Sequence, residues 1–314
     1  MSPSPRVGTL LALLCLLLLG ALPILANARP AGADGLTFTI WLTLWQLGFA
    51  MPLLLLERRR RAPLAGAPIA GAAVARAPTG RRALAIALLT GAMFGLSTYM
   101  YVIAAQQAGP VSMAIALQAY PLFALLWEWL FLGQRKTRAE LGFTLLLILA
   151  LVYLTTGGTF SPGQVSWWSA FALGIPLLWS IAHILLKRLL VTTAITPNQV
   201  TASRLAISAV FLLLLQLALG ESDHLLAALD DGALQQAALL MGLAYYAELI
   251  LWFHAMRHIE VSRASALTVP APAVTLLLAV TFLGAPVEPY QVVAMAVLPV
   301  GLYGMVLSGR RAGG

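Results

Sequence analysis

The sequence predicts an all-α integral membrane protein with ten transmembrane helices arranged as two inverted five-helix repeats. Of the 314 residues, 61% are hydrophobic and only 10% are charged, and the mean hydropathy is +0.89. A soluble core of this size cannot bury so much apolar surface. The apolar residues form long runs separated by short polar segments, and part of the second half of the chain repeats a pattern of the first half.

Ten apolar runs are long enough to form spanning helices, because a helix that crosses the hydrocarbon core needs roughly 20 predominantly apolar residues. Most connections between the runs are short, but a loop rich in Ala, Gly, Pro and Arg extends from Glu57 to Arg82. The predicted spans are residues 7–26, 36–56, 83–105, 110–133, 140–157, 167–188, 197–219, 232–256, 261–284 and 290–308.

The first run has two interpretations. Arg6, the Leu-rich stretch from Leu10 and the small residues around Ala26 resemble a signal peptide with a cleavage site. The run is also nearly long enough to span a bilayer, and it has a loose counterpart at the start of the second half of the chain. We expect a retained first helix, with cleavage as the alternative.

The basic residues predict the orientation, because loops rich in Lys and Arg are kept on the cytoplasmic side. With the N-terminus inside, 17 of the 19 Lys and Arg residues fall in cytoplasmic segments. Only Arg29 falls outside, and Arg204 lies within a span. The pattern predicts a multi-pass protein of the bacterial inner (plasma) membrane with both termini in the cytoplasm. It also accounts for the net charge of +8 without nucleic acid as a partner.

An internal repeat links the fourth and ninth runs. Residues 118–133 align with residues 269–284 at a constant offset of 151, and Pro121 and Pro272 each stand ten residues before Phe-Leu-Gly. Each copy holds five helices, an odd number, so the second copy must enter the membrane with reversed orientation. We therefore predict one repeat over residues 1–157 and a second over residues 158–314. Inverted repeats of this kind recur in secondary transporters, whose sites lie near the membrane midplane between the halves.

At these residues the sequence resembles the EamA-type transporters of the drug/metabolite transporter superfamily. Those proteins carry ten helices in two five-helix repeats, and their fourth and ninth helices contain a proline followed by an apolar stretch that ends in Leu-Gly-Glu. Here Gln134 and Ala285 replace the glutamates, whereas Trp179 and Arg204 stand where the family often has them. The resemblance implies export of amino acids, metabolites or amphipathic drugs, often driven by a proton gradient.

Three charged residues lie well within the predicted spans, where a charge at the bilayer centre costs about 3 kcal/mol or more. Arg204 and Glu248 lie seven and nine residues from the cytoplasmic ends of consecutive antiparallel helices, so they are placed where they can form an ion pair. That pair is either structural or part of proton coupling. Glu128 lies five residues from the end of its helix, so it either snorkels to the interface or faces a cavity.

Polar and aromatic residues share helix faces with these charges. Gln118, Pro121 and Glu128 line one side of the fourth helix, and Tyr245 and Trp252 flank Glu248 on the eighth. Prolines free backbone carbonyls, which a membrane helix tolerates beside protein or a wet cavity. The predicted substrate-binding and coupling residues are Gln118, Tyr120, Pro121, Glu128, Arg204, Tyr245, Glu248, Trp252, Pro270 and Pro272.

No metal or cofactor is expected. Cys15 is the single cysteine, which excludes a disulfide framework and a cysteine metal site. His254 and His258 have the i, i+4 spacing of metal ligands, but no third ligand is evident nearby. The chain contains no phosphate-binding loop, His-Glu-x-x-His sequence or nucleophile elbow.

The predicted function is that of a secondary transporter, with a small-molecule substrate, protons as a coupling ion and the lipid bilayer as partners. A membrane-embedded enzyme would need polar residues clustered in loops or at one bilayer face, and the sequence lacks them. A scaffold or receptor would tolerate the composition, but it gives no reason for an inverted repeat or for charges within the spans. The sequence leaves substrate identity, direction of transport and oligomeric state open.

Overall fold

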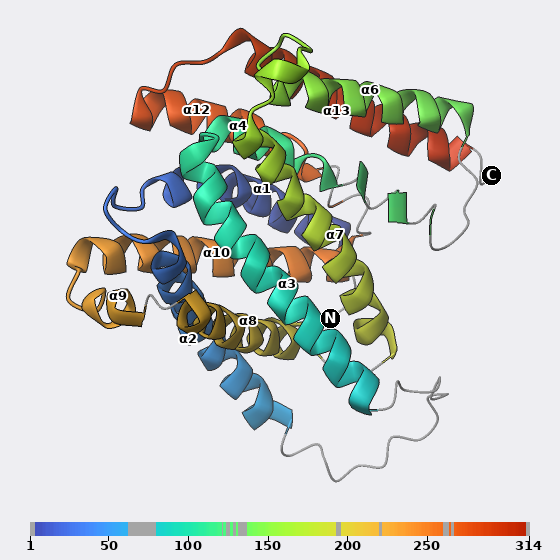
Figure 1. Ribbon diagram of the computed structural model, residues 1–314. Coiled ribbons are helices and arrows are strands. Elements are labelled where there is room, and N and C mark those ends of the chain that lie inside the picture. The colour runs from blue at the N-terminus through green and yellow to red at the C-terminus, as the bar shows by residue number, and fades with distance from the viewer. Residues whose placement is uncertain are drawn as a thin grey trace, which may run out of the picture. The chain divides into compact units, whose positions relative to one another are not determined.

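The computed structural model describes residues 4–61, 80–120, 122–123, 126–127, 130, 137–192, 196–219, 222–259, 264 and 267–311. All regular secondary structure in these residues is helical (Figure 1). Seven of the described helices are long and apolar enough to cross a membrane, and Ala271–Leu283 and Pro289–Gly304 are shorter apolar helices. The all-α membrane class is therefore confirmed. The count of ten spans stays a prediction, because parts of the fourth and ninth runs lie outside the described residues.

The chain forms two compact units, and each unit combines segments from both halves of the sequence. Neither unit coincides with the proposed repeats, so the division at residue 157 stays a prediction. Three helices contribute to both units: α3 (Gly80–Gln107), α7 (Trp167–Thr192) and α10 (Gly232–His258). Unit 1 comprises residues 1–28, 100–181 and 251–314, and unit 2 comprises residues 29–99 and 182–250.

Unit 1 is built around two pairs of packed helices. In the first pair, α6 (Arg138–Thr155) lies against α13 (Pro289–Arg311). In the second pair, α1 (Pro5–Asn27) lies against α12 (Ala271–Leu283), and the short helix α4 (Pro110–Leu117) contacts all four. The Thr275 hydroxyl on α12 donates a hydrogen bond of 2.7 Å to the Gly20 carbonyl on α1. The small residues Ala12 and Cys15 are fully buried on the same helix, so α1 is part of the packed interior of unit 1.

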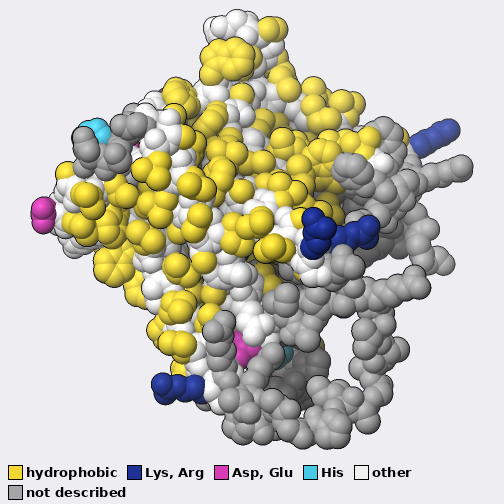
Figure 2. Space-filling model, turned by 60° about the horizontal axis from the view of Figure 1, so that its bottom comes forward, with side chains coloured by type: hydrophobic (Ala, Val, Ile, Leu, Met, Phe, Trp, Pro, Cys, Tyr) yellow, Lys and Arg dark blue, Asp and Glu magenta, His cyan; other side chains and the backbone are white. Residues whose placement is uncertain are grey.

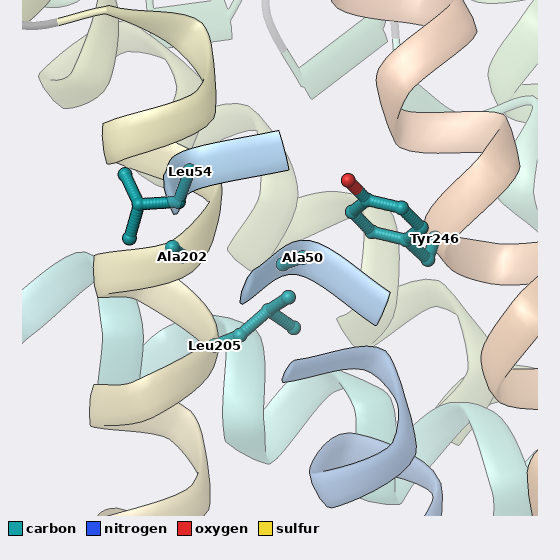
Figure 3. Packing of buried hydrophobic residues seen from close by; sticks show 5 residues of the cluster. All are labelled: Ala50, Leu54, Ala202, Leu205 and Tyr246. Atoms are coloured by element: carbon teal, nitrogen blue, oxygen red, sulfur yellow. The ribbon is translucent and has the colours of Figure 1, made fainter. Parts of the chain in front are cut away.

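Unit 2 is organised by the packing of α2 (Gly35–Arg61) against α8 (Pro197–Leu219). Figure 3 shows the apolar side chains of this contact, Ala50 and Leu54 from α2, Ala202 and Leu205 from α8, and Tyr246 from α10. At one end of the pair, the Thr196 hydroxyl and the Asn198 amide both donate to the Glu57 carboxylate, at 3.0 and 2.9 Å. These bonds connect the end of α2 to the start of α8.

Two short elements were not predicted from the sequence. The helix α9 (Ser222–Ala227) occupies the acidic segment between α8 and α10, and a 3-10 turn forms at Pro162–Gln164. Both are too short to span a bilayer and lie in connections between longer helices. Their apolar periodicity is too brief to separate them from a loop, which is why sequence reasoning passed over them.

The surface is apolar, as a bilayer requires. Hydrophobic side chains cover most of the face drawn in Figure 2, and only a few charged side chains are visible on it. Large apolar side chains are exposed on most long helices, and Leu217, Leu277 and Val300 are each more than 60% exposed. In water such a surface would aggregate, whereas lipid tails solvate it.

The fourth and ninth runs were predicted as single helices, and the structure corrects both. The helix that begins at Pro110 ends at Leu117, and Gln118 and Ala119 form a turn. In the ninth run, Val269 and Pro270 form a turn before α12 begins at Ala271. Proline lacks a backbone N–H and clashes with the preceding turn, so a long apolar run with Pro near its middle is broken there.

Close packing at Gly20 predicts that this glycine tolerates no side chain. A Cβ atom there would lie 2.5 Å from the Val274 Cβ and 3.0 Å from the Ala271 carbonyl oxygen. We expect Gly20→Ala to destabilise the protein by about 1–3 kcal/mol, because α1 and α12 must separate. Gly48→Ala is the matched control, since a Cβ at Gly48 meets nothing within 4 Å. Thermal unfolding of both variants in detergent tests this, and equal melting temperatures would contradict the packing.

Candidate functional site

A buried guanidinium lies at the centre of unit 2. Arg204 on α8 is only 5% exposed, and its Cζ atom lies 4.0 Å from the centroid of the Phe94 ring on α3. A cation over an aromatic face is attracted by the ring quadrupole, and the attraction reaches about 2 kcal/mol where water is excluded. The imidazole ring of His183 on α7 also lies close to Phe94, with 5.3 Å between the two ring centroids.

Two residues of α10 complete this group. Tyr245 and Glu248 are 4% and 6% exposed, and both interact electrostatically with Arg204. The Tyr245 hydroxyl shares a hydrogen bond with Thr98, whose own hydroxyl donates to the Phe94 carbonyl at 2.7 Å. The structure therefore brings together three of the predicted site residues. We call Phe94, Thr98, His183, Arg204, Tyr245 and Glu248 the arginine cluster.

Two glycines place Phe94 over Arg204. Gly91 and Gly95 form a Gly-x-x-x-Gly motif, which permits close helix contact, and α3 approaches α8 at both positions. A Cβ at Gly91 would lie 2.5 Å from the Ile207 side chain, and the Ser208 hydroxyl donates to the Gly91 carbonyl at 2.7 Å. Phe94 lies between these glycines in the sequence, so its ring is held close to the backbone of α8.

Several buried polar groups of unit 2 are not satisfied by the described part of the protein. The Nε atom of Arg204, the amide nitrogen of Gln46 and the hydroxyl of Thr201 are buried with no hydrogen-bond partner there. Buried polar atoms are rarely left in this condition, and each such atom calls for an explanation. Arg204 therefore has a hydrogen-bond donor to spare in this conformation.

Unit 1 contains a cavity of about 210 Å³ that includes several other predicted residues. Gln118 from the turn after α4, Val269 and Pro270 from the turn before α12, and Pro272 all contribute to its wall. The remaining lining residues come from α4, α12 and α13: Ile115, Ala273, Val292, Met295, Ala296, Leu298 and Pro299.

The two helix breaks at this cavity occupy equivalent positions in the proposed repeats. Gln118 and Ala119 form one turn and Val269 and Pro270 form the other, and the two turns differ by the same 151 residues that align the sequences. Irregular backbone at membrane depth is found only where protein covers it or a wet cavity receives it. The irregular backbone of the two turns therefore lies at the wall of this cavity.

The other predicted site residues fall elsewhere. Trp252 packs against a small apolar cluster that includes Ala12 and Ala255, and Tyr120 is half-buried beyond the α4 turn. Pro121 and Glu128 lie outside the described residues. Nearby, the Trp127 indole donates to the Ser180 hydroxyl at 2.8 Å.

Sequence reasoning missed three members of the arginine cluster, Phe94, Thr98 and His183. A histidine inside the sixth predicted span was a usable signal, since titratable side chains are rare within membranes. Phe94 and Thr98 gave no such signal, because aromatic and threonine side chains are common in membrane helices. Only the packing of α3 on α8 shows their part in the group.

No group of three or more His, Cys, Asp or Glu side chains among the described residues is arranged to hold a metal ion. His258 instead accepts a hydrogen bond at its Nδ1 atom from the Ser4 backbone N–H, at 3.1 Å. The bond ties the start of α1 to the end of α10 in unit 1.

The cavity predicts a pattern of thiol accessibility. In a Cys15→Ala background, Gln118→Cys and Val269→Cys should react with N-ethylmaleimide, because this small uncharged reagent can enter the cavity and reach a thiol on its wall, whereas a thiol packed between helices is out of its reach. Ala279→Cys is the control, since Ala279 lies on α12, is fully buried and is absent from the lining. Mass spectrometry of membranes after labelling measures the modified fraction. If both lining cysteines are as inert as the control, the cavity is closed to water.

The family of this chain is shown by its sequence. The profile of the EamA-like transporter family matches residues 6–156 and 166–307. No curated protein sequence matches significantly. One crystal structure of a protein shares the fold with a TM-score of 0.61 at 19% identity, over 98% of this chain and 100% of that one. The resemblance seen at the Pro to Phe-Leu-Gly segments is thereby confirmed, and the chain belongs to the EamA-like transporter family.

Proposed function

We propose that this family member is a secondary transporter of the bacterial inner membrane that exports a small amino acid, metabolite or amphipathic drug in exchange for protons. Family membership supports transport as such. The observation that supports coupling to protons is the arginine cluster, in which Arg204, Tyr245 and Glu248 interact within helices apolar enough to span a membrane.

The depth of the cluster supports a functional role. Arg204 is seven residues from the start of α8, and Glu248 is ten residues from the end of α10. At a rise of 1.5 Å per residue, both lie about 10 to 15 Å along their helices. A membrane protein that needed only stability would gain as much from apolar side chains here, because buried ion pairs rarely stabilise more than a well-packed apolar group.

Glu248 is the proposed proton carrier. A carboxyl in a low-dielectric site is neutral unless a cation lies close, so the distance to Arg204 decides whether Glu248 holds a proton. Its titratable neighbours in the cluster are Tyr245 on its own helix, Arg204 on α8 and His183 on α7. Arg204 has a spare donor, so a substrate group or a second protein conformation can draw it away from Glu248. Alternation between these states would load and release one proton per cycle.

The orientation proposed for the protein has both termini in the cytoplasm, on the evidence of the 17 basic residues on that side. Arg29 is the one basic residue assigned to an outer loop, and it is half-buried close to Asp34. Burial lowers the pKa of the Arg29 guanidinium, and the charges of Asp34 and Tyr99 oppose that shift. Because Asp34 offsets the charge of Arg29, this residue counts little against the rule that Lys and Arg collect in cytoplasmic loops.

Reporter fusions test this orientation. A fluorescent protein that folds only in the cytoplasm should be active when fused after Gly314, and alkaline phosphatase, which folds only in the periplasm, should be active in the loop from Thr159 to Ser166. Phosphatase activity at Gly314 would contradict an even number of spans with the N-terminus inside.

Glu248→Gln tests the proposed coupling. A growth screen of an overexpressing strain against toxic metabolites and drugs first identifies a substrate, and proteoliposomes then give its flux. Gradient-driven efflux should fall by at least about tenfold, because the amide cannot exchange a proton, whereas counterflow exchange of substrate should persist. Glu288→Gln is the matched control, since Glu288 is exposed at the start of α13. Wild-type efflux with an unchanged pH profile in Glu248→Gln would assign Glu248 a structural role.

A further inference from the structure

The cavity of unit 1 differs in chemistry from the arginine cluster. Eleven of the described residues line it, none of these eleven is ionisable, and Gln118 is the only one of them with a polar side chain. A charged group placed inside would lose its hydration and gain no counter-ion, which costs several kcal/mol. The occupant of this cavity is therefore uncharged over the part that enters.

The volume limits the size of the occupant. An apolar protein cavity of about 150 Å³ accommodates benzene, and this one measures about 210 Å³. The extra volume is of the order that a second fused ring adds. Three proline rings, Pro270, Pro272 and Pro299, form part of the wall. Proline rings pack well against flat aromatic rings, as they do in the recognition of proline-rich peptides.

The backbone at the cavity adds a hydrogen-bond acceptor. Pro299 lies inside α13 and has no N–H, so the carbonyl of Met295, one turn earlier, lacks its usual helical partner. Met295 and Pro299 both line the cavity. The Gln118 amide, which also lines the cavity, offers a donor and an acceptor. An occupant with one hydrogen-bond donor, such as a hydroxyl or a ring N–H, complements these groups.

We propose that the cavity of unit 1 binds an uncharged ring system of about two fused rings that carries one hydrogen-bond donor. The Gln118 side-chain oxygen accepts the hydrogen bond from that donor, and the proline rings contact the faces of the ring. The proposal rests on the proposed function, since it assigns the substrate class of the transporter: molecules with a flat apolar ring system, bound through that part.

Binding of three related probes to the purified protein in lipid nanodiscs tests the assignment. The probes are 2-naphthol, naphthalene and 2-naphthoate, which share two fused rings and differ in carrying a hydroxyl, no polar group or a carboxylate. Equilibrium dialysis gives the dissociation constants, with empty nanodiscs subtracted to remove partition into lipid. We expect 2-naphthol to bind most tightly and 2-naphthoate to bind at least about 100-fold more weakly.

Two variants locate the site. Ala296→Phe places a ring in the cavity and should weaken binding of 2-naphthol by at least about tenfold. Gln118→Leu should weaken 2-naphthol about fivefold and leave naphthalene unchanged, because only the hydrogen bond is lost. Ala218→Phe on the exposed face of α8 is the control for Ala296→Phe. If Ala296→Phe does not fold, Ala273→Leu on α12 fills the same space.

Equal binding of 2-naphthol to wild type and to the filled variants would overturn the proposal, and would be the result if an acyl chain of the bilayer occupied the cavity. Preference for 2-naphthoate would overturn it as well. The measurement needs no gradient, so it is independent of transport. If the probes do not bind as expected but a screened substrate is still exported, the proposed substrate class is wrong and the proposed transport function is retained. If the probes bind as expected but no compound is transported, the proposed function fails instead.

Discussion

A bilayer offers the polypeptide backbone no water, and the rest of this structure depends on that constraint. Each N–H and C=O group at membrane depth must find a partner within the protein, so the described residues form helices and no strands. The same constraint makes a helix break informative. Two turns interrupt apolar runs, at Gln118–Ala119 and Val269–Pro270, and Gln118, Val269 and Pro270 line one cavity. Prolines disturb the helical hydrogen bonds in both runs, and both turns lie next to that cavity.

The two units use opposite chemistry inside similar helical packing. Unit 2 buries a guanidinium and an imidazole against one phenylalanine ring, and a carboxyl group and a phenol interact with that guanidinium. Unit 1 contains a cavity whose described lining has a single polar side chain, Gln118. Glycine has a different use in each unit. In unit 2, Gly91 and Gly95 bring α3 close enough to place Phe94 over Arg204, and in unit 1, Gly20 lets α1 and α12 share the Thr275 hydrogen bond. Small residues thus set the distances on which the polar contacts depend.

The fold class and the family could be predicted from the sequence because they depend on features that cover the whole chain, the long apolar runs and the repeated Pro to Phe-Leu-Gly pattern. Arg204, Glu248 and Tyr245 could be selected because polar side chains within spans are rare. Phe94 could not be selected from the sequence, because its role depends on the contact between α3 and α8 and not on its own side-chain chemistry. The end of α4 at Leu117 was not predicted, because a proline in an apolar run indicates a disturbed hydrogen-bond ladder but not where the helix before it ends. The division into two units was also beyond the sequence, since it depends on contacts between distant segments.

The pairing of α1 with α12 has a consequence for biogenesis. The hydrogen bond from Thr275 to Gly20 joins residues 255 positions apart, so α1 leaves the ribosome long before its partner exists. During that interval the face of α1 that carries Gly20, Ala12 and Cys15 has only lipid or the insertion machinery to contact. Its small apolar side chains are compatible with lipid during this interval, because they place no unpaired polar group in the hydrocarbon. Unit 1 therefore assembles after synthesis of the chain is almost complete, and a ribosome that stalls before α12 leaves an inserted but unfinished protein for the quality-control proteases of the membrane.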